Sequence, residues 1–110
     1  MLIGQWIFKA GGVTMYSPSF PRGGLAAIFS ASTLAKLGSP TLTITFEHKN
    51  HDDTTFATAG VFSSITTLNN FPQDVSNIKE EVRFAYQIGA TNEWEGFLLL
   101  MTSPAWRPYA

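Results

Sequence analysis

The sequence contains no cysteine, so neither a disulfide framework nor a thiolate metal site is available to it. Charge is also scarce, because charged residues make up only 14% of the chain against about 25% in an average soluble domain. Seven Lys and Arg residues nearly balance eight Asp and Glu residues, and no basic run occurs, which argues against nucleic acid as a partner. The scarcity of charge fits two interpretations: a surface covered in part by other subunits, or a surface rich in Ser and Thr.

Long apolar runs are missing as well. No stretch approaches the roughly 20 apolar residues that span a bilayer, so no membrane partner is expected. The segment Met1–Trp6 lacks the basic and apolar regions of a secretory signal peptide, so no such signal is expected either. The length of 110 residues predicts one domain, residues 1–110, with enough chain to bury a core without covalent cross-links.

What the sequence does contain is alternation of apolar and polar residues. In Thr41–His48, Leu42, Ile44 and Phe46 alternate with threonines, and Glu81–Ile88 repeats the pattern. A period of two with β-branched residues predicts strands that bury one face. The polar tract after Thr41–His48 is rich in turn-forming residues, so we expect a hairpin loop there.

Other segments are less regular. Residues 54–67 predict one strand, or two with a bulge at Gly60, and residues 69–74 predict a loop. Leu25–Leu37 fits a strand better than a helix, because no good N-cap precedes it. In the last strand, residues 93–101, the continuous apolar run from Phe97 predicts burial on both faces.

These segments together predict an all-β fold, a single antiparallel β-sandwich of about six to eight strands with jelly-roll or immunoglobulin-like connections. Gln5–Phe8 and Val13–Tyr16 predict short strands, and the alternative interpretation of residues 1–24 is an arm that reaches a neighbouring subunit. Residues 103–110 carry two prolines, which rules out a regular strand, and are expected to be a tail that docks on its own domain or a neighbour.

Catalytic and metal sites find little support. His48, His51, Asp52 and Asp53 are a candidate metal constellation, but a solvated hairpin loop explains them better. The serines lack a nucleophile-elbow context, and the glycine pairs do not form a phosphate-binding loop. We therefore expect no enzyme activity, no metal and no cofactor.

Aromatic and arginine side chains are the usual anchors of protein interfaces. The tail is rich in them, the last strand is expected to expose an apolar outer face, and the N-terminal strand adds two aromatic residues. The expected interface residues are Trp6, Phe8, Phe97, Leu99, Met101, Trp106, Arg107 and Tyr109. An alternative is a glycan-binding module in which Trp94, Trp106 and Tyr109 stack on sugar rings.

Several segments resemble small β-sandwich virion proteins of tailed bacteriophages. They are Leu42–Asn50, Asp53–Phe56, Gly60–Phe62, Ile78–Tyr86 and Pro104–Tyr109. The resemblance covers about two thirds of the chain, from residue 40 to residue 109, and its most specific element is the terminal Trp-Arg-Pro-Tyr.

The resemblance implies a structural protein on the capsid surface of a virion. The leading expectation is a capsid decoration, or cement, protein that binds the major capsid protein or other virion proteins. Such proteins are homo-oligomers, often trimers or rings, on a symmetric lattice. A head–tail or tail structural protein is a close alternative.

Overall fold

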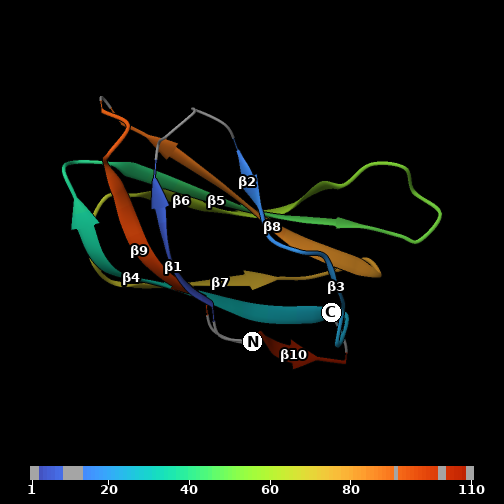
Figure 1. Cartoon of the computed structure of the whole chain (residues 1–110). Helices are drawn as coiled ribbons and strands as arrows, with labels where there is room; N and C mark the ends of the chain where they lie inside the picture. Colours follow the sequence, from blue (N-terminus) through green and yellow to red (C-terminus); the bar gives the residue numbers. More distant parts are fainter. Residues whose placement is uncertain (1–2, 9–13, 91, 102–103, 109–110) are drawn as a thin grey trace.

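The computed structural model describes residues 3–8, 14–90, 92–101 and 104–108. Within these residues the chain forms ten β-strands and no helix, arranged as two five-stranded antiparallel sheets that pack face to face (Figure 1). Sheet A comprises β1 (Ile3–Phe8), β4 (Ala26–Leu37), β7 (Asn70–Val75), β9 (Gly96–Met101) and β10 (Ala105–Arg107). Sheet B comprises β2 (Met15–Tyr16), β3 (Phe20–Pro21), β5 (Thr41–Lys49), β6 (Ala57–Ile65) and β8 (Glu81–Gly89). The predicted all-β antiparallel sandwich is confirmed.

The order of the strands distinguishes the two topologies that the sequence left open. Strand pairs are nested along the chain: β5 with β6, β4 with β7, β2 and β3 with β8, and β1 with β9. This long ribbon is rolled up by two further pairings, β4 with β9 and β5 with β8. A ribbon of eight strand positions closed in this way, with β2 and β3 sharing one position, is a jelly roll. β10 continues the position of β9 along β4 (Figure 1).

The core lies between the sheets and is dominated by aromatic rings. Leu42, Ile44 and Phe46 of β5 are fully buried, as their alternation predicts. The rings of Phe29 in β4 and Phe46 in β5 join the two sheets with centroids 4.1 Å apart, and the Phe84 ring lies 4.9 Å from that of Phe46. These three rings form the centre of the sandwich.

The strand interpretation of residues 25–37 is confirmed by β4, and its pattern shows where simple alternation fails. Ala27, Phe29 and Ala31 are buried. Thr33 continues this buried row, but a register shift between Thr33 and Ala35 then moves Ala35 to the outer face, opposite Leu98. Strict alternation along the segment predicts that Ala35 shares the inner face with Ala27 and Phe29; that prediction is wrong, because a bulge adds one residue to the strand.

Residues 69–74, predicted as a loop, instead form β7 from Asn70. Pro72 is tolerated there because β7 is an edge strand that pairs only with β4 among the described strands. For residues 54–67, the structure has one strand, β6, and not two. Its register with β5 shifts beside Gly60, where the sequence predicts a bulge.

The first 24 residues do not form a separate arm where the structure describes them. β1 pairs with β9 along its whole length, and β2 and β3 pair with β8. Ser17 adds a side-chain contact, its hydroxyl accepting a 2.8 Å hydrogen bond from the backbone N–H of Phe84. The expectation of an arm is corrected: these strands fill edge positions of the domain's own two sheets.

Tyr86 places a polar hydroxyl group inside the apolar core. Its side chain is buried in the core, its hydroxyl has no hydrogen-bond partner among the described residues, and burial raises the pKa of the Tyr86 phenol. A buried hydroxyl without a partner costs about 1–3 kcal/mol. We therefore expect Tyr86→Phe to leave the free energy of unfolding unchanged or to raise it by about 1 kcal/mol. Urea denaturation measures this, and a loss of stability would reveal a partner for the hydroxyl.

Candidate functional site

The outer face of sheet B is mainly polar, although Tyr16 and Val61 are exposed on it. β5 presents three half-buried threonines there, followed by Glu47 and Lys49. Arg83 of β8 pairs with Glu47 across the two strands at 2.7 Å, and Lys49 pairs with Glu81 at 3.3 Å. This face has the Ser/Thr and charge pattern of a solvated surface.

The outer face of sheet A is different at the end where β1, β9 and β4 lie side by side. The strand register sets Trp6 beside Leu98 and Leu98 beside Ala35, and in the next row it sets Phe8 beside Gly96 and Gly96 beside Leu37. We call this surface the apolar face, and it comprises Trp6, Phe8, Ala35, Leu37, Leu98 and Leu100. None of the six residues is charged, and Trp6, Phe8 and Leu37 are exposed.

Two aromatic rings are the most prominent part of the apolar face. The rings of Trp6 and Phe8 stack in parallel, with centroids 5.7 Å apart and an interplanar angle of 8°. They remain 40% and 36% exposed. Gly96 makes room for them, since a Cβ there would lie 2.9 Å from Cδ1 of Phe8 and would overlap the backbone of Ile7. The structure thus places both predicted aromatic residues of β1 on the surface, where a partner can reach them.

The other predicted apolar residues lie elsewhere. Phe97, Leu99 and Met101 are fully buried on the inner face of β9, so they are not an outer face. The prediction fails because every residue from Phe97 to Met101 is apolar. The sequence then does not show which alternate residues point outward. The outward positions are Leu98 and Leu100, which the sequence analysis missed.

The tail also differs from the prediction. Ala105–Arg107 is a regular strand, β10, because the two prolines flank it rather than interrupt it. Trp106 packs edge-on against Phe29, with centroids 5.8 Å apart, and lies over Gly23. Arg107 forms an ion pair with Asp74 of β7. Trp106 and Arg107 therefore dock on their own domain, one of the two outcomes expected for the tail, and Tyr109 lies outside the described residues.

This placement removes the sugar-stacking platform expected from Trp94, Trp106 and Tyr109. Trp94 lies in the turn before β9, next to the end of β4 where Leu37 pairs with Gly96. Trp106 pairs with Ala27 near the other end of β4. Ten residues of strand separate these positions, which corresponds to about 30 Å, so the two indoles cannot contact one sugar.

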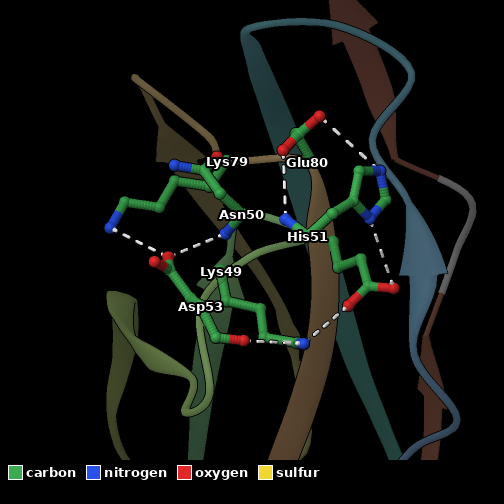
Figure 2. Close-up of polar contacts among 7 residues, drawn as sticks. Lys49, Asn50, His51, Asp53, Lys79 and Glu80 are labelled. Carbon is green, nitrogen blue, oxygen red and sulfur yellow. Dashed lines mark hydrogen bonds and ion pairs between the residues drawn. The ribbon is translucent and has the colours of Figure 1, made fainter.

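The candidate metal constellation is an ionic network between two loops. His51 donates its backbone N–H to Glu80 at 3.0 Å, and its ring lies between Glu80 and Glu81 at 3.6 and 3.8 Å (Figure 2). Asp53 accepts a hydrogen bond from the backbone N–H of Asn50 at 2.9 Å (Figure 2). The network anchors the β5–β6 hairpin to the segment before β8. Across the described ranges, no group of three His, Asp or Glu side chains has metal-binding geometry.

His48 gives this region a pH dependence. Its Nδ1 accepts a hydrogen bond from the backbone N–H of Lys79 at 3.2 Å, and burial, with the charge of Lys79, lowers the pKa of His48 below the usual 6.5. The unfolded chain then binds this proton more readily than the folded protein. The stabilisation that neutral His48 contributes to the folded protein is fully present above pH 6.5 and is lost as the pH falls below that value.

We expect His48→Asn to reduce this loss of stability at low pH, because the asparagine oxygen replaces the Nδ1 acceptor and does not titrate. Thermal melts of both proteins from pH 8 to about pH 5 measure the effect. An identical decline in the variant would assign the pH dependence to other groups.

No protein family, curated protein or solved structure matches the chain, so the comparisons assign it to no family. Within the described part of the chain there is no helix of the length and apolar character needed to cross a membrane.

Proposed function

We propose that this protein is a non-enzymatic structural component of a tailed-bacteriophage particle, a capsid decoration protein that binds the major capsid protein. The observation that carries the proposal is the apolar face of sheet A, set against the mainly polar outer face of sheet B. This difference between the two outer faces gives the domain a defined side for docking. The sequence resemblance described above supplies the kind of partner.

The physical argument rests on how exposed apolar groups are distributed. Apolar residues scattered singly over a surface are ordinary, whereas a contiguous patch marks a site of interaction. Here the patch spans three adjacent strands, and its β1 side carries a stacked Trp–Phe pair. Trp is among the residues that contribute most at interfaces when a partner excludes water from them. The rigid sheet beneath keeps these side chains in place before binding, which lowers the entropic cost of docking.

The test is sedimentation of the purified protein with particles of the phage that encodes it. We expect saturable binding with a copy number set by the lattice symmetry. Leu37→Ser, on the apolar face, should weaken binding at least tenfold, equivalent to about 1.4 kcal/mol. Leu68→Ser is the matched control, because it makes the same change at a similarly exposed leucine outside the apolar face, 49% against 45%.

The outcomes separate the alternatives. Failure of the wild-type protein to sediment with particles would refute the proposal. Binding at a few copies per particle, confined to one vertex, would point to the head–tail alternative. Equal binding by the two serine variants would refute the apolar face as the docking surface.

A further inference from the structure

β1 is the least protected sheet edge among the described strands. The strand order of sheet A ends at β1, and no other described strand pairs with its outer side. The segment Ile3–Phe8 contains neither proline nor charge, and its register with β9 is unbroken over six residues. Such an edge offers a row of free backbone N–H and C=O groups to another strand.

The other edges carry the features that prevent strand pairing. β7 contains Pro72 and an exposed Asp74. β6 shifts register twice against β5, which bends its edge. β2 and β3 have two residues each, and β3 ends in Pro21. Natural sheets use these devices against unwanted association, so their absence from β1 alone points to a strand that is paired in the assembled protein.

We propose that the edge of β1 pairs antiparallel with β1 of a second copy of this chain, across a two-fold axis. This inference rests on the proposed function, because it describes how the apolar face is presented to the capsid. A second copy is the occupant that the strand itself favours. Two identical neighbouring strands related by a two-fold axis perpendicular to the sheet are antiparallel, and their contacts are repeated on both sides of the axis.

Side-chain alternation restricts the register of this pair. Ile7 points into the core while Trp6 and Phe8 point outward, and the same faces must match in both copies. The two-fold axis therefore passes between one residue of β1 and the same residue of the second copy, so that this residue lies opposite its own copy. When that residue is Trp6, its indole lies opposite the partner's Trp6.

The same register gives a steric fit at the next outward position. Phe8 then lies opposite the partner's Gly4, so a large ring meets a residue that has no side chain. Aromatic pairs opposite one another on an antiparallel sheet stabilise the pairing of the two strands. No residue of β1 is charged, so no like charges face each other across the axis.

The resulting sheet would run without interruption from β4 of one copy to β4 of the other, through β9 and β1 of each. The two apolar faces would join side by side into one larger docking surface. The unit is a dimer, and not the trimer or ring that the resemblance implies.

Single-cysteine cross-linking tests the proposal cleanly because the chain has no cysteine of its own. In the proposed register the two Trp6 Cα atoms lie about 4.5–5.5 Å apart. A disulfide needs roughly 4.4–6.8 Å, so Trp6→Cys should cross-link almost fully under mild oxidation. Phe8→Cys is the matched control on the same face, and its Cα atoms would be about 13 Å or more apart. We expect it to stay uncross-linked.

Light scattering on the unmodified full chain is the second measurement. We expect twice the mass of the 12.1 kDa chain at micromolar concentrations. A wild-type monomer would overturn the proposal, as would equal cross-linking of the two cysteine variants or none by Trp6→Cys. If the monomer still sedimented with particles, this inference would fail while the proposed function stood. If the protein formed the cross-linked dimer but did not sediment with particles, the proposed function would fail while this inference stood.

Discussion

Phe46→Ala should lower the free energy of unfolding by about 3–5 kcal/mol, the cost of truncating a fully buried phenylalanine. The ring of Phe46 is completely buried and contacts three others, those of Phe29, Phe62 and Phe84, at centroid distances of 4.1, 5.1 and 4.9 Å. Phe29 belongs to the opposite sheet, so the substitution opens a cavity at the point where the two layers meet. Since small domains have only about 5–15 kcal/mol of stability, this one change removes a large part of it.

The measurement is urea denaturation followed by circular dichroism, with Phe8→Ala as the matched control. Phe8 loses the same atoms in that variant, but from a ring that is exposed on the apolar face. We expect a cost of about 1 kcal/mol or less there, since surface substitutions rarely exceed that. Similar losses in the two variants would contradict the assignment of the core to the Phe29–Phe46 contact.

The parts of the fold that the sequence predicts well are those in which one strand alone carries the information. β5 and β8 alternate apolar and polar residues, because each packs one face on the core and leaves the other to water. The strand character of β4 follows from the missing N-cap and from the apolar residues at the alternate positions Ala27, Phe29 and Ala31. In each case the pattern is local, and the structure confirms it.

The remaining features depend on neighbours that a single strand does not reveal. Pro72 suggests a loop until β7 is known to be an edge strand, where the missing N–H is not needed by a neighbour. The change of face between Thr33 and Ala35 becomes visible only in the register of β4 against β9. Within β9 every residue is apolar, so only the pairing with β1 and β4 shows that Leu98 points outward and Phe97 inward.

The candidate site follows the same rule. The sequence identified Trp6 and Phe8 because Trp and Phe are large and sit in a short alternating strand. It did not identify Leu37 or Leu98, which join them only through cross-strand register. Arg107 and Trp106 attracted attention by type, yet their partners Asp74 and Phe29 are far away in the chain.

Gly24→Ala should lower the free energy of unfolding by about 2–4 kcal/mol, because it forces β10 away from the sandwich. A Cβ on Gly24 would overlap the carbonyl oxygen of Arg107, which is backbone and has no rotamer to change. That same oxygen accepts a 2.9 Å hydrogen bond from the backbone N–H of Leu25. Displacing it breaks this bond and withdraws Trp106 from its contact with Phe29.

Gly89→Ala is the matched control, since its Cβ would meet nothing nearer than the Thr41 carbonyl oxygen at 4.0 Å. We expect its free energy of unfolding to stay within about 0.5 kcal/mol of wild type. With Trp6 and Trp94 replaced by phenylalanine, fluorescence reports on Trp106 alone, and Gly24→Ala should shift its emission to the red as water reaches the indole. If Gly24→Ala cost no more than Gly89→Ala and left the emission unchanged, β10 would not be docked on Gly23 and Gly24. The tail would then be available to a partner, as the sequence alone allowed.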